Sequence, residues 1–99
     1  MYKRQEHKGA VLNLSDKSLT AGGEGISLTK NELRILQLLF ENPGRTVSRD
    51  ALMTRLWESD SFVDDNTLTV NVTRLRRKLE EAGLSGLIVT KKGAGYMVE

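Results

Sequence analysis

Guanidinium, amide and hydroxyl groups gather within residues 66–77, a combination that suits contact with DNA. Arginine donates paired hydrogen bonds to phosphates and to the guanine edge, and Asn and Thr reach phosphate oxygens and base edges. At about 100° per residue, one helix face would carry many of these groups and one small apolar residue. That face comprises Asn66, Val70, Thr73, Arg74 and Arg77. The stretch therefore predicts a helix that enters the major groove.

A regular apolar stripe on the same stretch predicts the helix that must position these groups. The stripe consists of Leu68, Val72, Leu75 and Leu79, at steps of four, three and four residues. Such spacing is typical of an amphipathic helix that packs on a core. Asp64 or Asp65 is expected to cap the helix, while the basic residues collect toward its negative end.

A solvated outer face is the ordinary role of basic residues on an amphipathic helix, and it is the alternative to a DNA-binding face. Two observations favour DNA. No acidic residue lies between Asn66 and Leu79, so the acidic–basic pairs that stabilise exposed helices are missing. Asn and Thr are also poor helix formers, so helix stability does not explain their presence.

Positive charge collects in the last third of the chain, although the net charge of the whole chain is only +2. Residues 66–98 carry six basic side chains against two acidic ones, whereas residues 1–65 carry nine against ten. A surface that binds a polyanion is therefore expected in the C-terminal third.

The composition fits one soluble domain. The chain has 99 residues, 38% of them hydrophobic, which is enough for one modest core. No apolar run approaches the length of a membrane span, and no signal-peptide pattern is present. The absence of cysteine excludes disulfides and thiolate zinc sites, and it fits a cytoplasmic protein.

Catalysis and cofactor binding are not expected. The only histidine is His7, in a segment without periodicity, so no serine has a nearby imidazole base. Asp64 and Asp65 suggest a metal site at first, but adjacent carboxylates before a helix are far more often caps. The sequence thus predicts a protein without enzyme activity, bound metal or cofactor.

The N-terminal part is expected to provide scaffold. Residues 1–9 are mostly polar and without periodicity, and we interpret them as a linker or tail. Three short strand candidates follow, at residues 11–14, 18–20 and 26–28. Because Asp, Ser and Gly turns separate them, they indicate a small antiparallel meander.

Two further helices are predicted before the basic one. Thr29 and Glu32 have the spacing of a capping box, and residues 42–44 end the first helix. Ser48 is expected to cap the second. Two helices with a short Gly-containing turn, followed by a third rich in Arg, Asn and Thr, are typical of helix-turn-helix proteins. Trp57, at the end of the second helix, is expected in the core; alternatively, its indole N–H reaches a backbone phosphate.

An acidic loop and a β-hairpin flank the basic helix. Residues 58–65 are acidic, so they suit a protein partner or water better than DNA. Residues 87–98 alternate as two strands around a basic, Gly-rich tip at residues 91–95. No helix follows the tip, so it is a weak candidate for a phosphate-cradling loop. Lys91 and Lys92 favour a tip that enters the minor groove or follows a phosphate ridge.

Three stretches, in this order and spacing, resemble the C-terminal effector domain of OmpR/PhoB-type response regulators. They are Leu28-Thr29-x-x-Glu32-Leu33-x-x-Leu36, Asn66-Thr67-Leu68-x-Val70-x-Val72-x-Arg74-Leu75-Arg76-x-Lys78-Leu79 and Lys92-Gly93-Ala94-Gly95-Tyr96. The resemblance covers residues 10–99. Within it, residues 63–72 are similar to regulators of cell-envelope and antimicrobial-peptide stress in Gram-positive bacteria.

The resemblance implies an α+β fold, a winged helix-turn-helix. It would have an N-terminal antiparallel four-stranded sheet, three helices and a C-terminal β-hairpin wing, with the recognition helix at residues 66–81. The implied function is sequence-specific binding of double-stranded DNA for transcription regulation, as the effector half of a bacterial two-component response regulator.

The resemblance also implies individual contacts. The base-facing positions are Thr69, Val70 and Arg74. Phosphate contacts are implied at Trp57, Asn66, Thr67, Asn71, Thr73, Arg76, Thr90 and Tyr96, and we add Arg77 from the same outer face. Lys92 matches the minor-groove position of the wing, with Lys91 beside it. Many members carry Arg where this chain has Asn66, Thr73 and Lys92; Lys lacks the planar fork of Arg, so weaker contacts are expected.

Members of the family bind direct repeats as head-to-tail dimers, follow a receiver domain that a sensor kinase phosphorylates, and touch RNA polymerase through the segment matching residues 58–65. The implied partners are therefore double-stranded DNA, the parent protein's receiver domain and RNA polymerase, with no membrane and with a monomeric isolated domain. The alternative is a winged helix that docks an acidic protein. Steep salt dependence of binding to random duplex would favour DNA.

Overall fold

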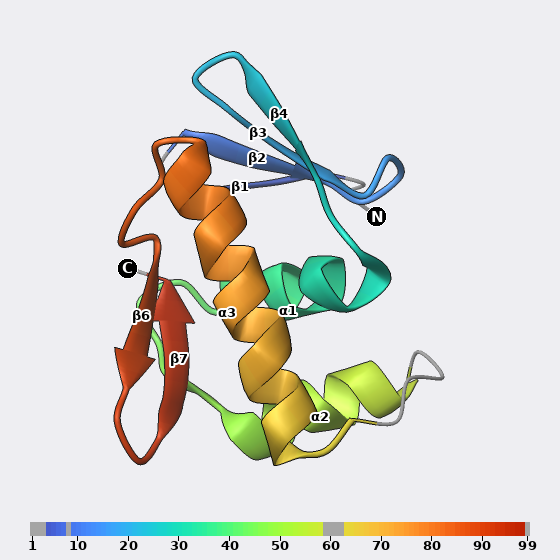
Figure 1. Cartoon of the computed structure of the whole chain (residues 1–99), viewed down its shortest axis with the longest axis vertical. Coiled ribbons are helices and arrows are strands. Elements are labelled where there is room, and N and C mark those ends of the chain that lie inside the picture. The colour runs from blue at the N-terminus through green and yellow to red at the C-terminus, as the bar shows by residue number, and fades with distance from the viewer. Residues whose placement is uncertain (1–3, 8, 59–62, 99) are drawn as a thin grey trace.

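The computed structural model describes residues 4–7, 9–58 and 63–98, and these form two antiparallel sheets and three helices (Figure 1). The elements are β1 (Arg4–His7), β2 (Ala10–Asn13), β3 (Ser18–Ala21), β4 (Glu24–Ser27), α1 (Lys30–Glu41), β5 (Val47–Ser48), α2 (Arg49–Glu58), α3 (Asp65–Glu81), β6 (Ile88–Lys91) and β7 (Gly95–Val98). This order confirms the predicted α+β winged helix-turn-helix.

The N-terminal sheet is an antiparallel meander in the order β1-β2-β3-β4. Leu12 lies opposite Leu19 in the register, and both are fully buried. Alternation of buried and more exposed residues along β2 gives the sheet one face toward the helices. In Figure 1 the sheet lies above α1 and next to the C-terminal end of α3, at the opposite end of the molecule from the wing tip. It serves as scaffold.

Strand β1 differs from the expectation that residues 1–9 form a linker or tail. Residues 4–7 pair with β2 along their length, Glu6 with Val11 and His7 with Ala10. The His7 ring lies 5.6 Å from the Phe40 ring of α1, measured between centroids. A polar edge strand shows no apolar alternation, because its pairing comes from the backbone of its neighbour.

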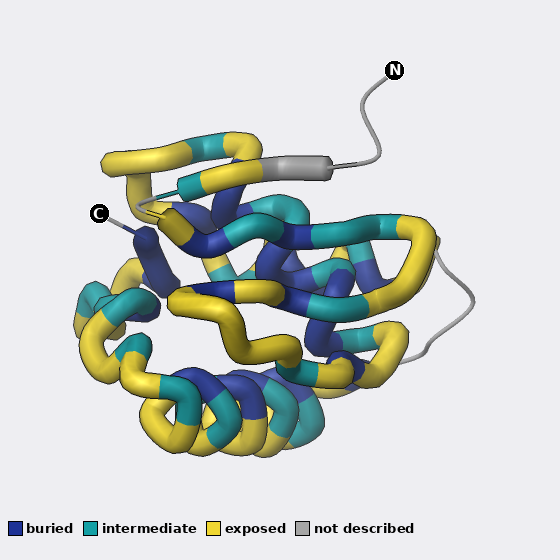
Figure 2. The backbone as a smooth tube through the Cα atoms, turned by 90° about the horizontal axis from the view of Figure 1, so that it is seen from above, coloured by how far each residue is buried: buried dark blue, intermediate teal, exposed yellow. Residues whose placement is uncertain are grey.

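The predicted caps of the first two helices are confirmed. Thr29 Oγ1 accepts from the Glu32 backbone N–H at 3.2 Å, and Glu32 Oε1 accepts from the Thr29 N–H at 2.9 Å, so both halves of the capping box are present. Ser48 Oγ accepts from the Ala51 N–H at 3.1 Å at the start of α2. All three helices turn a buried side toward one core (Figure 2).

A second sheet, in the order β5-β7-β6, joins the wing to the start of α2. Its shortest strand, β5, pairs Val47 with Tyr96 and Ser48 with Gly95. A Cβ atom on Gly95 would lie 1.9 Å from the Val47 carbonyl oxygen, and its φ is +155°. Only glycine therefore fits this crossing, which places the wing beside the helices.

Candidate nucleic-acid interface

Helix α3 lies on the core as the stripe predicted. Leu68, Val72, Leu75 and Leu79 are all buried. Asp64 is the N-cap, and its Oδ1 accepts from the Thr67 backbone N–H at 2.8 Å. This hydrogen bonding holds the pKa of Asp64 below its ordinary value of 3.8. Because the apolar stripe of α3 faces the core, the opposite side of the helix is exposed to solvent.

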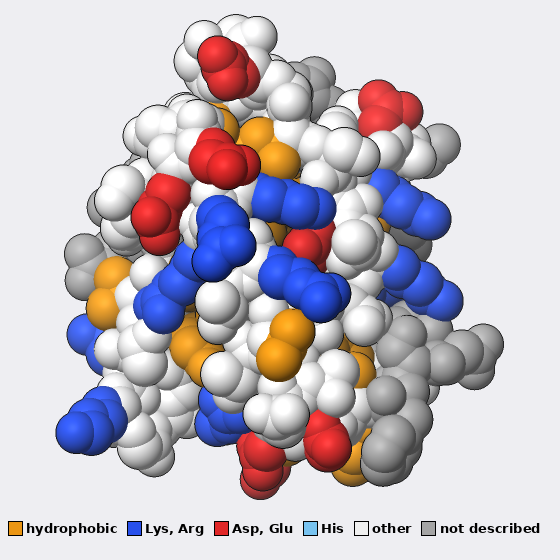
Figure 3. Space-filling model, viewed as in Figure 1, with side chains coloured by type: hydrophobic (Ala, Val, Ile, Leu, Met, Phe, Trp, Pro, Cys, Tyr) orange, Lys and Arg blue, Asp and Glu red, His pale blue; other side chains and the backbone are white. Residues whose placement is uncertain are grey.

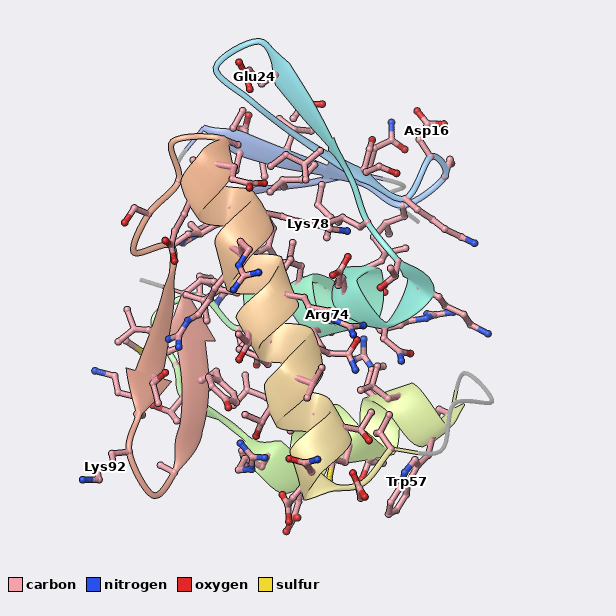
Figure 4. The ribbon with its side chains drawn as sticks, in the orientation of Figure 1. Asp16, Glu24, Trp57, Arg74, Lys78 and Lys92 are labelled. Atoms are coloured by element: carbon pink, nitrogen blue, oxygen red, sulfur yellow. The ribbon has the colours of Figure 1, made fainter. Side chains whose placement is uncertain are left out.

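Basic side chains gather over α3 and the β6–β7 hairpin on the face shown in Figure 3. Arg74 and Arg77 are exposed, and neither makes a hydrogen bond or ion pair with another part of the described chain. Figure 4 shows Arg74 projecting from the middle of α3. Val70, one turn earlier, has 40% of its surface exposed, which is unusual for a valine. This face therefore offers two guanidinium groups without partners in the described chain, near one exposed apolar side chain.

Three polar side chains of α3 donate hydrogen bonds to the carbonyl group four residues earlier in the same helix. Thr69 Oγ1 donates to the Asp65 carbonyl at 3.1 Å and Thr73 Oγ1 to the Thr69 carbonyl at 2.9 Å. Asn71 Nδ2 donates to the Thr67 carbonyl at 2.9 Å. Because these donors are used within α3, the threonine oxygens face outward chiefly as acceptors.

Two of the predicted phosphate contacts, Arg76 and Thr90, are bonded to each other. Arg76 Nη2 donates to Thr90 Oγ1 at 2.5 Å and to the Ile88 carbonyl at 3.1 Å. The Arg76 guanidinium also lies over the Tyr96 ring, 5.9 Å from its centroid. Arg76 thus ties α3 to the wing, and its remaining guanidinium donors are left for a phosphate.

Tyr96 is buried, with 6% of its surface exposed, and two arginines lie against its ring. The second arginine is Arg49, whose guanidinium carbon lies 5.8 Å from the ring centroid and whose Nη1 donates to the Tyr96 hydroxyl at 2.8 Å. Little of the Tyr96 surface is therefore open to a phosphate, and its hydroxyl already accepts from Arg49.

Arg49 is a site residue that the sequence analysis missed. Its Nε pairs with Asp65 Oδ1 at 3.0 Å, and its Nη2 donates to the Asp65 carbonyl at 2.6 Å and to Thr69 Oγ1 at 2.8 Å. The hydrogen bond with Asp65 raises the pKa of Arg49 above its usual value. No local pattern identifies it, because its partners are 16 to 47 residues away in the sequence.

Trp57 lies on the surface, so its expected place in the core is wrong. Its exposed fraction is 49%. The indole N–H donates to the Val63 carbonyl at 3.0 Å, which fastens the end of α2 to the buried Val63 before α3. A phosphate contact through this N–H would have to replace that bond. Residues 59–62 of the predicted acidic loop lie outside the described residues.

The wing tip carries its charge outward. Lys92 is exposed and extends from the tip of the hairpin in Figure 4. The turn is closed by the Ala94 N–H, which donates to the Lys91 carbonyl at 2.8 Å. Gly93 has a φ of +78°, a left-handed conformation that favours glycine. The glycines at the tip are therefore accounted for by turn geometry.

The described residues form neither a metal-binding cluster nor a membrane-spanning helix. They contain no group of three His, Cys, Asp or Glu side chains able to hold a metal ion. None of the described helices is long and apolar enough to cross a membrane. The basic face of α3 and the wing is the candidate site supported by the positions of Arg74, Arg77 and Lys92.

The chain is similar to proteins that act in regulation. Residues 23–98 match the family "Transcriptional regulatory protein, C terminal". The chain is 50% identical over 88 residues to the response regulator protein GraR of Staphylococcus aureus (strain MRSA252); the match covers 89% of this chain and 39% of GraR. The chain therefore spans about two fifths of the length of this relative.

Solved structures agree with this match. The C-terminal domain of the nisin resistance regulator NsrR, a lantibiotic response regulator, has a TM-score of 0.85 at 37% identity, with 95% of both chains covered. The DNA-binding domain of RstA from Klebsiella pneumoniae, in complex with the RstA box, has a TM-score of 0.79 at 26% identity, with 98% of this chain and 97% of that chain covered.

Proposed function

The chain belongs to the family of C-terminal domains of transcriptional regulatory proteins, and from this premise we propose that it binds double-stranded DNA sequence-specifically to regulate transcription. In this proposal α3 lies in the major groove and the wing tip, residues 91–95, lies at the minor groove. The RstA domain, solved with the RstA box, supports DNA as the ligand.

One observation carries the proposal. Several cations of the described chain are bonded within the fold, namely Arg49, Arg55, Arg76 and Lys78. Arg74 and Arg77, on the outer face of α3, have no such partner among the described residues. Phosphates and base edges can accept the hydrogen bonds of these two guanidinium groups, and phosphate contacts also release counterions from DNA, so both effects offset the cost of desolvating the charges.

The roles follow from position on this face. Thr69, Val70 and Arg74 contact base edges, and Arg74 reads guanine because its planar fork matches the guanine O6 and N7. Val70 suits the methyl group of thymine. The phosphate contacts are assigned to Trp57, Asn66, Thr67, Asn71, Thr73, Arg76, Arg77, Thr90 and Tyr96. Lys91 and Lys92 contact the minor groove or its phosphates without the fork of arginine.

The wider context is proposed from the relatives named response regulators. The chain would be the effector half of a two-component regulator in the cytoplasm, controlled by the receiver domain of its parent protein. It would bind direct repeats as a head-to-tail dimer and touch RNA polymerase through residues 58–65. We assign it no enzyme activity.

The test begins with a mobility shift on random duplex at low salt, followed by a salt titration. We expect the logarithm of the binding constant to fall with the logarithm of salt concentration at a slope steeper than about −3, because each neutralised phosphate contributes about −0.9. Selection from a random pool of duplexes should then return a repeated motif. No binding at low salt would reject DNA and favour the alternative, a module that docks an acidic protein.

A further inference from the structure

We propose that Arg49 is a positioning residue that determines base specificity, by fixing Thr69 as a hydrogen-bond acceptor toward DNA. This inference rests on the proposed DNA-binding function. It assigns Thr69 a base with an amino group in the major groove, adenine or cytosine.

Hydrogen bonds to two other elements of the fold fix the orientation of the Arg49 side chain. Arg49 is the first residue of α2, yet its guanidinium reaches the first turn of α3 and the ring of Tyr96 in β7. Its side chain has 33% of its surface exposed. Four donated bonds, to Asp65 Oδ1, the Asp65 carbonyl, Thr69 Oγ1 and the Tyr96 hydroxyl, hold it in one orientation.

The hydrogen-bonding role of Thr69 follows from the chemistry of its two neighbours. A guanidinium only donates, so Thr69 Oγ1 must accept from Arg49. A carbonyl only accepts, so the single hydroxyl proton of Thr69 must go to Asp65. One lone pair remains on Oγ1, and no proton remains for a base.

An acceptor of this kind distinguishes base edges. In the major groove, adenine presents the N6 amino group and cytosine the N4 amino group as donors, whereas guanine and thymine present carbonyl oxygens. Thr69 would therefore bind adenine or cytosine and repel the oxygens of guanine and thymine. Without Arg49, the hydroxyl can rotate and donate, so the preference at this position should relax.

Arg55 provides a matched control on the same helix. It pairs with Glu41 at 2.9 Å, and its side chain has 26% of its surface exposed, close to that of Arg49. In the described chain it contacts neither α3 nor the wing through a hydrogen bond or ion pair. Arg55→Met thus removes a partly exposed, ion-paired arginine from α2 without touching Thr69.

The experiment is selection from a random duplex pool with the wild type and the variants Arg49→Met, Thr69→Val and Arg55→Met. We expect one position that is enriched in adenine or cytosine with the wild type and with Arg55→Met. Arg49→Met and Thr69→Val should both lose that enrichment while keeping the preference assigned to Arg74. Arg49→Lys keeps the positive charge but carries its donors on a single nitrogen, so it should retain part of that enrichment.

A base analogue tests the bond directly. If adenine is selected, replacement by purine, which lacks the N6 amino group, should weaken wild-type binding by about tenfold. If cytosine is selected, 2-pyrimidinone serves the same purpose. With Arg49→Met and with Thr69→Val, the same base replacement should weaken binding by less than about threefold. Thr69→Val replaces only the hydroxyl by a methyl group, so it tests the bond even if Arg49→Met folds poorly.

The outcomes separate the two proposals. Wild-type base preferences in a folded Arg49→Met, or a Thr69-dependent position enriched in guanine or thymine, would overturn the inference about Arg49 alone. If Arg49 has only a structural role, Arg49→Met should lower the affinity for all sequences equally and leave the selected motif unchanged. That result would also overturn the inference about Arg49. A wild-type protein that binds no duplex would instead reject the proposed function.

Discussion

The ammonium group of Lys78 in α3 lies 2.6 Å from Glu32 Oε1 in α1. Glu32 is buried, with 1% of its surface exposed, and the same oxygen accepts from the Thr29 N–H at the start of α1. Lys78 also donates to the Ser27 carbonyl at 3.0 Å. One carboxylate therefore both caps α1 and holds α3, the helix that carries the proposed DNA-binding face.

Removing the cation of this pair should be costly. Lys78→Met leaves the Glu32 carboxylate buried without its counter-charge, and we expect the free energy of unfolding to fall by about 3 kcal/mol. Urea denaturation measures this. Arg55→Met, at a more exposed ion pair, should cost less than about 1 kcal/mol, and the double variant Glu32→Gln/Lys78→Met should recover part of the loss. A Lys78→Met protein as stable as the wild type would contradict this role.

Arg74 is the arginine on which base recognition should depend most. Arg74→Ala should weaken binding to the selected duplex by about 1–3 kcal/mol and relax the preference at one base pair. The measurement compares affinities for the selected and scrambled duplexes. An unchanged ratio between the two would show that Arg74 does not read a base.

Arg76 should have two separable effects. Arg76→Ala should lower the magnitude of the salt slope by about one unit, as expected for one lost phosphate contact, and should also destabilise the wing, because the bonds to Ile88 and Thr90 are lost. Arg76→Lys keeps the charge and should keep the slope while losing the fork. Identical slopes for the wild type and Arg76→Ala would leave Arg76 with the internal role alone.

The capping carboxylate of Asp64 predicts a pH dependence. Its pKa in the folded protein is lowered from 3.8, so the bond to Thr67 stabilises the fold above that value. The stabilisation should disappear as the pH falls through the lower folded pKa. Asp64→Asn keeps a capping acceptor but does not titrate. The difference in unfolding free energy between wild type and variant should be constant above about pH 5 and change below it; a flat difference down to acid unfolding would refute this.

Gly95 should tolerate no side chain, because its Cβ would meet the Val47 carbonyl oxygen. Gly95→Ala should reduce the free energy of unfolding by more than about 3 kcal/mol, beyond the usual range for a single substitution. Gly93→Ala is the control: it has open space, so only its left-handed backbone costs, about 1–2 kcal/mol. Equal melting temperatures of the two variants would contradict the close approach.

Sequence reasoning succeeded where the information was local. The stripe of α3, its cap at Asp64 and the capping box at Thr29 and Glu32 all depend on residues within a few positions of one another. Such patterns follow directly from helix periodicity and from the unsatisfied N–H groups of the first turn.

It failed where the stabilising partner was distant or was backbone. Strand β1 is polar and is held by pairing with β2, so residues 4–7 carried no apolar signal. The sequence pattern places Trp57 on the inner face of the second helix with Leu52, Met53 and Leu56, but the side chain lies at the surface, where its indole N–H donates to the Val63 carbonyl. Arg49 lies 47 residues from Tyr96 in the sequence, and only the fold brings them together.

The reach of Arg49 across three elements has a consequence for chimeras between relatives. Its guanidinium binds the start of α3 and the wing at once. A recognition helix transferred alone into a relative would therefore lose this partner, or face a different residue at position 49. Exchange of DNA specificity between family members should therefore work best when the residues at positions 49 and 96 are exchanged together with the recognition helix.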